Sequence, residues 1–430
     1  MRQNTFFEHF RLAYGLCFLL LAACAPGPTP TATPKMPTLT LAPPTAAAEL
    51  PTGTMKPPIP TRLLPTQSNT PAVPDELLPH TLYHLRNGGQ VFRMERDGKT
   101  VTQLTFEPVR VDGYDVSLAD GSVAYVVENQ LVLIDADGSN RRVLVDGGPR
   151  DENNPSFFKD QLRDPVFSPD GGTIAYGHNH KGLNLYDISA SVSNLVIEDQ
   201  YADPLPNGAR IPIETYSPVR YSPDGMKLLL ALGHWESPPS HAVYHPDTNI
   251  LVRYAEVQDY INCCSYHGGP VWSQDSSSFY GVASVHDSAY AYGELWKVDA
   301  GSGAATRSFT STFVRGGTVY LPVEPFPAPD GQLYYFFGTY AVDSGFLHAP
   351  VLELVRSAPD GVTDRSVLRD ENFVLMDEAL WAPDASFVVV SMAPARNWNQ
   401  DGGVLELYYT NGQKSMVWLA PLGYQMRWGP

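Results

Sequence analysis

Polar turns followed by apolar runs recur along the chain at a regular spacing. The run FSPDGGTIAYG at 167–177 returns, with changes, as YSPDGMKLLLAL at 221–232, WSQDSSSFYGV at 272–282, FPAPDGQLYYFFG at 326–338, WAPDASFVVVSM at 381–392 and, in a degenerate form, SLADGSVAYVV at 117–127. The aspartates of these six copies are 50 to 55 residues apart. Each copy predicts a tight turn of Pro-Asp-Gly chemistry followed by a buried strand. Repetition at this period indicates one array of similar units.

A second run occurs in seven copies, and each copy ends in its own turn. The copies are VFRMERDG at 91, LVLIDADG at 131, LNLYDISA at 183, AVYHPDTN at 242, LWKVDAGSG at 295, LELVRSAPDG at 352 and LELYYTNG at 405. In five of them apolar and polar residues nearly alternate before a Gly, Asn or Asp turn, as in a half-buried strand that enters a hairpin. Four strands in each repeat of about 50 residues describe one blade of a β-propeller.

The C-terminus accounts for the difference between six first runs and seven second runs. The chain ends in Trp428-Gly429-Pro430, which matches the beginning of the missing first run. The last strand would therefore join the N-terminal blade and remove the free sheet edges. We expect residues 80–430 to form an all-β, seven-bladed β-propeller that is closed by its C-terminal strand.

The repeat resembles that of a known family. A Trp or Phe before Ser-Pro-Asp-Gly, followed by an Ile-Ala-Tyr-like strand, is similar to the repeats of TolB-like propellers, which also occur as the non-catalytic propellers of prolyl oligopeptidase-like peptidases. The resemblance covers about 350 of the 430 residues. It implies the fold and leaves the function open, because members of this fold class bind proteins, peptides or sugars, or gate an attached enzyme.

The first residues indicate export. Two arginines and one acid precede or flank an apolar run of twelve residues, Leu12 to Ala23. That run is too short to span a bilayer, which needs about 20 residues, and its layout is that of a secretory signal. The tetrad Leu21-Ala22-Ala23-Cys24 resembles the bacterial lipobox, which implies a lipoprotein signal peptide over 1–23 and lipid attachment at Cys24. The alternative is an ordinary signal peptide with an incidental cysteine.

Residues 24–79 have the composition of a disordered linker. Between Ala25 and Pro79 the chain contains 15 of its 39 prolines together with 11 threonines. Such a segment lacks the large apolar side chains that a core requires, and proline-rich chain is stiff and extended. We expect it to act as a stalk between the lipid and the propeller.

Net charge narrows the range of partners. The formal charge of −17 disfavours nucleic acid, because an acidic surface repels phosphate. We expect a lipid-anchored protein on the extracytoplasmic side of the cell envelope, whose partner is a protein, a peptide or a glycan. Acids are frequent in the long loops, which slightly favours a cationic partner.

All the long loops are expected on one face of the propeller, opposite the short Pro-Asp-Gly turns. We refer to these as the long-loop face and the turn face. Function concentrates on loops, although irregular loops also collect polar and aromatic residues without a function. The candidate ligand-binding residues are His178, His180, Trp235, Cys263, Cys264, His267 and Trp398.

Cys263 and Cys264 are adjacent in the sequence. A disulfide between neighbours requires a strained ring, because consecutive Cα atoms are closer than a disulfide normally allows. Outside the cytoplasm the pair would still tend to oxidise. Two hypotheses stay open, a disulfide that stiffens the loop and two reduced thiols that pack as small hydrophobic groups.

Catalysis is the competing hypothesis. The sequence contains no Gly-x-Ser-x-Gly elbow, and no cofactor or metal site is predicted. A propeller hydrolase or lyase would need loop histidines and carboxylates such as Asp151, Glu152, Asp377 or Glu378. Trp272, Trp381 and Trp428 are expected to be packing anchors of the blades. The sequence favours binding over catalysis and leaves both open.

Overall fold

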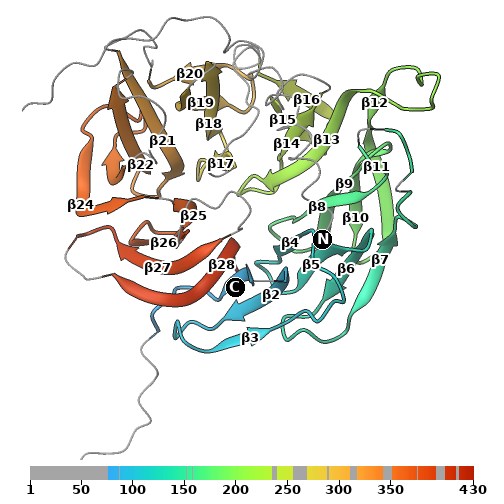
Figure 1. Ribbon diagram of the computed structural model, residues 1–430, viewed down its shortest axis with the longest axis horizontal. Coiled ribbons are helices and arrows are strands. Elements are labelled where there is room, and N and C mark those ends of the chain that lie inside the picture. The colour runs from blue at the N-terminus through green and yellow to red at the C-terminus, as the bar shows by residue number, and fades with distance from the viewer. Residues whose placement is uncertain are drawn as a thin grey trace, which may run out of the picture. The chain divides into compact units, whose positions relative to one another are not determined.

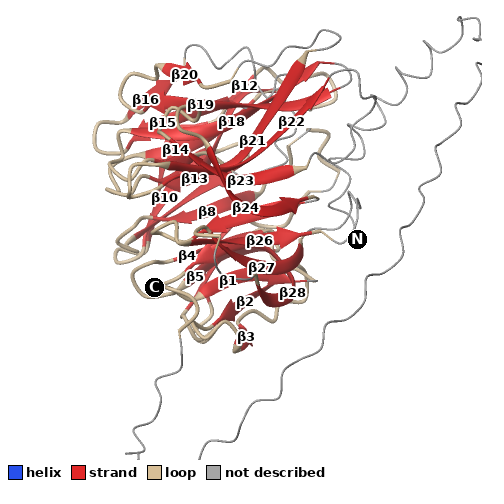
Figure 2. Ribbon diagram, turned by 90° about the vertical axis from the view of Figure 1, so that its left-hand side faces the viewer, coloured by secondary structure: helices blue, strands red, loops and turns tan. Residues whose placement is uncertain are grey.

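The computed structural model describes residues 76–430 except 87, 152, 157, 235–239, 255–268, 288–289, 310–316, 342–350, 375, 394–401 and 413–415. The described residues belong to one compact unit, Pro71–Pro430. Every regular element among them is a β-strand, as Figures 1 and 2 show. No helix in this part of the chain has the length and hydrophobicity needed to cross a membrane. The predicted signal peptide, Cys24 and the linker up to residue 75 lie outside the described residues.

Four sheets contain four antiparallel strands each, and every strand pairs with the next one along the chain. Their strands are β4 (Gly113–Val116), β5 (Val123–Val127), β6 (Gln130–Ile134) and β7 (Arg142–Asp146); β8 (Leu162–Phe167), β9 (Thr173–His178), β10 (Gly182–Asp187) and β11 (Val192–Glu198); β17 (Val271–Trp272), β18 (Ser278–Asp287), β19 (Tyr290–Asp299) and β20 (Ala305–Arg307); β21 (Thr318–Pro327), β22 (Leu333–Ala341), β23 (Leu352–Ser357) and β24 (Ser366–Phe373).

A fifth sheet follows the same plan and carries one short additional strand at its first edge. Its strands are β12 (Gln200–Tyr201), β13 (Pro212–Tyr221), β14 (Leu228–Gly233), β15 (Ser240–His245) and β16 (Ile250–Arg253). The additional strand pairs with the beginning of β13.

The remaining strands form one seven-stranded sheet that joins the two ends of the chain. In order across the sheet they are β25 (Met376–Trp381), β26 (Phe387–Met392), β27 (Gly403–Tyr409), β28 (Val417–Trp428), β1 (Leu82–Arg86), β2 (Gln90–Met94) and β3 (Val101–Gln103). The first half of β28 pairs with β27, as in Leu407 opposite Val417. Its second half pairs with β1, and Leu82 lies opposite Trp428. This sheet therefore divides into two groups of strands that share β28.

Hydrogen bonds within the repeated turns explain their sequence. In the turn at 168–173 the Ser168 hydroxyl donates to Asp170 over 2.6 Å, and the Gly172 amide donates to the same carboxylate oxygen over 3.0 Å. These bonds lower the pKa of Asp170. Gly171 has a φ of 72°, a left-handed conformation that favours glycine. The aspartates of the repeat are therefore structural.

The core lies between neighbouring sheets. All five residues of β5 are buried, whereas the outer strand β7 is partly exposed. Ala124 and Val126 of β5 pack with Phe167, Ile174 and Tyr176 of the next sheet. Figure 1 shows the sheets arranged around a common centre, with β4, β8, β13, β17, β21 and β25 towards it. The predicted all-β class is confirmed, and the innermost strands are the elements that position the site described next.

Candidate functional site

Charged side chains from five innermost strands converge at the centre of the sheets. We call this set the axial cluster, and it consists of Asp115 on β4, Arg220 on β13, Glu324 on β21, Glu378 on β25 and Arg427 on β28. Arg427 Nε lies 3.6 Å from Asp115 Oδ1, and Arg427 Nη1 lies 3.8 Å from Glu378 Oε1. Arg220 interacts electrostatically with the other four members. Residues up to 312 positions apart in the sequence, Asp115 and Arg427, thus share one electrostatic site.

Bulges in the innermost strands help to position these side chains. The pairing of β13 with β14 shifts between Pro218 and Arg220, and the pairing of β25 with β26 shifts between Met376 and Glu378. On β21 the shift falls around Glu324, whose φ is 53°. A bulge bends the strand and re-aims a side chain away from the alternating pattern. At such a bulge, a charged side chain need not point into the apolar space between two sheets.

The carboxylates of the cluster also accept hydrogen bonds from backbone amides of neighbouring innermost strands. Asp115 Oδ2 accepts a hydrogen bond of 2.8 Å from the Phe167 amide. Glu378 accepts from the Met426 amide with both oxygens, over 3.0 and 3.1 Å. The innermost strand of a sheet has no partner on its inner side, so these acceptors satisfy amides that would otherwise be unpaired. Asp115 therefore links β4 to β8, and Glu378 links β25 to β28.

Tryptophan side chains make a second set of links between innermost strands. Trp381 Nε1 donates to the Glu324 carbonyl over 2.9 Å, and Trp428 Nε1 donates to the Trp381 carbonyl over 2.7 Å. Trp272 Nε1 donates to the Arg220 carbonyl over 3.3 Å. Trp272 and Trp381 are buried. These contacts agree with the predicted role of the three tryptophans as packing anchors.

Burial raises the pKa values of the acids in the axial cluster. Burial, and then the nearby Glu378 and Asp377, raise the pKa of Glu324 to about 8, against the opposing effects of the Ala379 amide and Arg220. Burial raises the pKa of Glu378 to about 7, against the opposing effects of Arg427 and the Met426 amide. The two glutamates therefore titrate near neutral pH.

Solvent reaches part of the cluster. The side chains of Asp115, Glu378 and Arg427 are 18%, 22% and 36% exposed, and Arg220 is exposed as well. Glu324 is only 6% exposed, and its Oε1 has no hydrogen-bond partner among the described residues. A ligand at the centre could thus meet two guanidinium groups and two accessible carboxyl groups.

The sequence analysis predicts only one member of this cluster. Glu378, with its neighbour Asp377, is a candidate carboxylate predicted for the long-loop face, and the other four members are not among the candidates. The signal is a charged residue one to three positions before the residue that precedes the repeat turn or, at Glu324, before Phe326. Arg220 precedes Tyr221, and Arg427 precedes Trp428. Asp377 accepts from the Gly402 amide over 3.1 Å and so helps to hold a loop.

His178 is the last residue of β9 and His180 lies in the connection between β9 and β10, and both have partners within the protein. His178 is 4% exposed, its Nε2 lies 2.7 Å from Asp160 Oδ1, and burial lowers its pKa. His180 Nε2 lies 2.7 Å from the Phe158 carbonyl, and its ring stacks on Tyr201 with 4.8 Å between centroids. Neither histidine belongs to the axial cluster, and their role as ligand contacts stays a prediction.

Asp199 connects the same histidine loop to the next sheet. It is 7% exposed and accepts from the amides of Tyr216 and His180, over 3.0 and 3.1 Å. Burial raises the pKa of Asp199 to about 6. The Arg210 guanidinium lies 4.5 Å above the Tyr201 ring. These contacts show that the polar side chains of this loop hold it against the next sheet.

Of the other predicted site residues, only Asp151 lies among the described residues. Asp151 is exposed and accepts a hydrogen bond of 2.9 Å from the Asn153 amide. Among the described residues, no three His, Cys, Asp or Glu side chains converge as metal ligands would. The candidates that lie outside the described residues are Glu152, Trp235, Cys263, Cys264, His267 and Trp398. Their predicted contacts, and the predicted disulfide, stay predictions.

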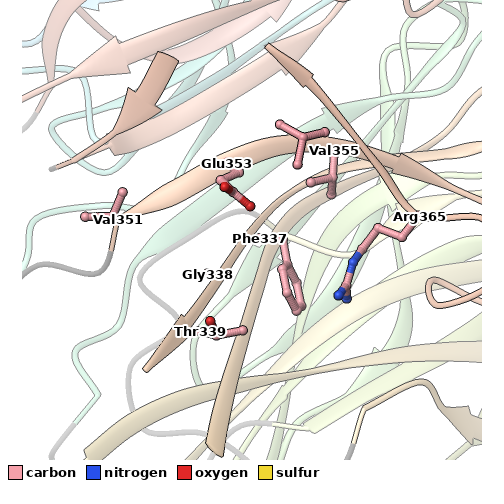
Figure 3. A pocket seen from close by; sticks show the side chains of 8 residues that line it. Phe337, Gly338, Thr339, Val351, Glu353, Val355 and Arg365 are labelled. Atoms are coloured by element: carbon pink, nitrogen blue, oxygen red, sulfur yellow. The ribbon is translucent and has the colours of Figure 1, made fainter. Parts of the chain in front are cut away.

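A pocket of about 520 Å³ lies on β22, β23 and the beginning of β24, apart from the innermost strands (Figure 3). Arg365 covers the Phe337 ring, with its guanidinium carbon 4.0 Å from the centroid. Val351 and Val367 at the rim are each about half exposed. The remaining lining residues are Gly338, Thr339, Glu353 and Val355. The pocket is open and has only Glu353 and Arg365 as charged groups, so it offers less chemistry than the axial cluster.

Four-stranded antiparallel sheets that share a centre, with charged groups on their innermost strands, define a protein of the β-propeller class. A scan against models of protein families finds no match for the chain, and a search of curated proteins finds no similar sequence.

Solved structures of propeller proteins are similar to this chain. TolB from Acinetobacter baumannii is 15% identical, with a TM-score of 0.40, over 81% of this chain and 81% of that one. An oligogalacturonate lyase from Vibrio parahaemolyticus is 12% identical, with a TM-score of 0.48, over 79% of this chain and 84% of that one. A prolyl endopeptidase is 13% identical, with a TM-score of 0.46, over 82% of this chain and 51% of that one. The predicted resemblance to TolB-like and peptidase propellers is confirmed, and it concerns the fold alone.

Proposed function

We propose that this chain is a lipid-anchored binding module of the cell envelope, in which seven blades close into one propeller. Five sheets supply one blade each, and the seven-stranded sheet supplies two that share β28. The pairing of β28 with both β27 and β1 supports closure by the C-terminal strand. The lipobox-like tetrad that ends in Cys24 supports the anchor, and the Pro/Thr-rich segment supports a stalk.

One observation carries the binding function, namely the axial cluster. Five charged side chains from five innermost strands meet at the centre, where solvent reaches four of them. Acceptors for the strand amides require only the acids, whereas the charge of Arg220 costs desolvation free energy that its neighbours only partly return. Perturbed pKa values at a shared centre are typical of functional sites. The ligand is a protein, a peptide or a glycan that reaches the centre of the propeller.

A thermal-shift screen of the whole chain against peptides, glycans and envelope proteins tests this function. A ligand at 100 times its dissociation constant should stabilise the protein by about 2.7 kcal/mol. The shift should be lost in Arg220→Gln and kept in Arg142→Gln, a control that removes an exposed arginine from the outer strand β7. If no ligand gives a shift, or if every shift survives Arg220→Gln, the axial cluster is not the binding site.

A hydrolase or lyase is the second candidate function. It is favoured by the raised pKa values of Glu324 and Glu378, since a carboxyl group that titrates near neutral pH can donate or accept a proton in catalysis. The double hydrogen bond from the Met426 amide to Glu378 favours a structural role instead. Cleavage products, sought by mass spectrometry after incubation with each ligand and absent with Glu378→Gln, would establish catalysis.

A further inference from the structure

Arg220 differs from the other cation of the axial cluster. Arg427 Nη1 donates to the Met426 carbonyl over 2.8 Å, and the guanidinium of Arg427 also lies near Asp115 and Glu378. The guanidinium of Arg220 donates no hydrogen bond to any residue in the described part of the chain, and the residue is exposed. A guanidinium carries five N–H donors in a planar fork that matches a carboxylate. Arg220 therefore offers unused donors at the centre of the propeller.

The charges around Arg220 can favour an anion. Its electrostatic neighbours are one cation, Arg427, and three acids, Asp115, Glu324 and Glu378. When both glutamates hold a proton, Arg220, Arg427 and the ionised Asp115 carry a combined charge of about +1. When both are ionised, the combined charge is about −1. The sign of the combined charge at the site thus depends on whether Glu324 and Glu378 are protonated.

Glu324 supplies a second, independent observation. Its side chain is 6% exposed and lies within electrostatic range of Arg220, and its Oε1 lacks a hydrogen-bond partner in the described residues. A protonated carboxyl group is a donor, and a buried donor without an acceptor is unfavourable. An oxygen of a bound ligand could accept that hydrogen bond after a small local adjustment.

We propose that Arg220 binds a free carboxylate group of the ligand, in a bidentate pair, with Glu324 as a neighbouring proton donor. The proposal rests on the proposed binding function and names the chemistry of its ligand. Two sources share this chemistry, the C-terminal carboxylate of a peptide and the carboxylate of a uronic acid sugar. It also reverses the expectation, drawn from the acidic loops, of a cationic partner.

The protonation of the two glutamates makes the proposed binding pH-dependent. Glu324 faces Glu378, Asp377, Arg220 and the Ala379 amide, and Glu378 faces Arg427, Asp377 and the amides of Gln425 and Met426. Their pKa values of about 8 and about 7 mean that both are mainly protonated at pH 6 and mainly ionised at pH 9. A carboxylate should therefore bind about tenfold more tightly at pH 6 than at pH 9.

Calorimetric titration of the whole chain tests the proposal with four probes, acetylglycine, acetylglycinamide, glucuronate and glucose. At pH 6 we expect one or both carboxylates to bind and their uncharged counterparts not to bind. Acetylglycine alone would indicate a peptide end, and glucuronate alone an acidic sugar. Arg220→Gln should weaken binding about tenfold or more, whereas Arg142→Gln should bind like the wild type. Arg220→Lys, which keeps the charge and loses the fork, should fall between them.

Glu324→Gln distinguishes binding at Arg220 from a structural role of Arg220. The measured quantity is the difference in carboxylate affinity between pH 6 and pH 9, which a structural role would leave unchanged. Glutamine stays neutral at all pH values, so this variant should lose part of the difference between pH 6 and pH 9. Equal binding of acetylglycine and its amide, no binding of either carboxylate, or wild-type binding by folded Arg220→Gln or Arg220→Lys would overturn the proposal. If the ligand screen meanwhile finds an uncharged ligand that depends on Arg220, the binding function stands and only the carboxylate assignment fails.

Discussion

Three single residues, Asp115, Glu324 and Glu378, satisfy backbone amides that the innermost strands would otherwise leave unpaired. Innermost strands have unpaired amides on one side, and a buried unpaired amide costs about 1–3 kcal/mol. Each of these acids accepts a hydrogen bond from an amide of a neighbouring innermost strand, Phe167, Ala379 and Met426 respectively. The burial that brings the acids close to those amides also raises the pKa values of all three. Burial of the three acids is therefore the common cause of their hydrogen bonds to the strand amides and of their raised pKa values.

Glu324→Gln should flatten the dependence of stability on pH. The folded-state pKa of Glu324, about 8, lies above its ordinary value of 4.5, so the folded protein binds more protons than the unfolded chain between these values. The wild type should therefore lose stability as pH rises through this window, by roughly 1–4 kcal/mol from Glu324. Urea unfolding at pH 5, 6, 7 and 8 measures this loss.

The variant should show a smaller loss over the same range, with Glu378 accounting for part of what remains. Glu353→Gln, which replaces an exposed glutamate on β23, should keep the wild-type dependence. If Glu324→Gln also keeps it, the proton affinity assigned to Glu324 is wrong.

At the scale of elements, β28 holds two groups of strands together. Its first half completes the group that begins with β25, and its second half pairs with β1. Trp428 lies in that second half, where its indole donates to the Trp381 carbonyl and its ring meets Phe387 edge-on with 6.2 Å between centroids. Trp418 lies in the first half and is 55% exposed. One strand thus carries both a joining and a solvent-facing tryptophan.

Trp428→Ala should destabilise the protein by about 2–4 kcal/mol, because it removes ring packing and one hydrogen bond at the junction of the two ends. Trp418→Ala, on the same strand, should change the free energy of unfolding by no more than about 0.5 kcal/mol. Chemical denaturation of both variants measures the difference. Similar effects from the two substitutions would mean that the junction between β28 and β1 contributes no special stability.

At the scale of the whole molecule, the proposal combines an anchor, a stalk and a propeller. In this proposal the anchor would hold the propeller outside the cytoplasm, and the stalk would let it reach a partner at some distance from the lipid. A single lipid chain binds a membrane only weakly, so stable anchoring requires more than one chain. The carboxylate chemistry proposed for Arg220 occurs on both peptides and acidic sugars in a cell envelope.

Cys24→Ser should release the protein from the membrane fraction, because serine lacks the thiol that would carry the lipid. Cys17→Ser, which changes the other N-terminal cysteine, should leave the protein in the membrane fraction. Fractionation of cells labelled with radioactive palmitate measures both location and lipid content. Retention of label by Cys24→Ser would rule out this attachment site.

The sequence by itself determined the all-β class, the four-stranded repeat and the presence of a turn after each first strand. These features depend on neighbours along the chain, since an alternating pattern defines a half-buried strand and Pro-Asp-Gly chemistry defines a turn. The turn at Ser168 and the buried strand β5 follow the prediction closely. The match of the C-terminal residues to an incomplete repeat also placed Trp428 beside the first strand.

Only the tertiary structure decided where the charged side chains meet. Asp115 and Arg427 are distant in the sequence, and their approach depends on packing between sheets and on the pairing of β28 with β1. The bulge at Glu324 depends on a left-handed backbone conformation, which the residues around Glu324 do not predict. His178, which looked like a loop residue open to a ligand, is buried against Asp160 for the same reason. Local patterns fix strands and turns, whereas burial and convergence arise only when distant strands pack together.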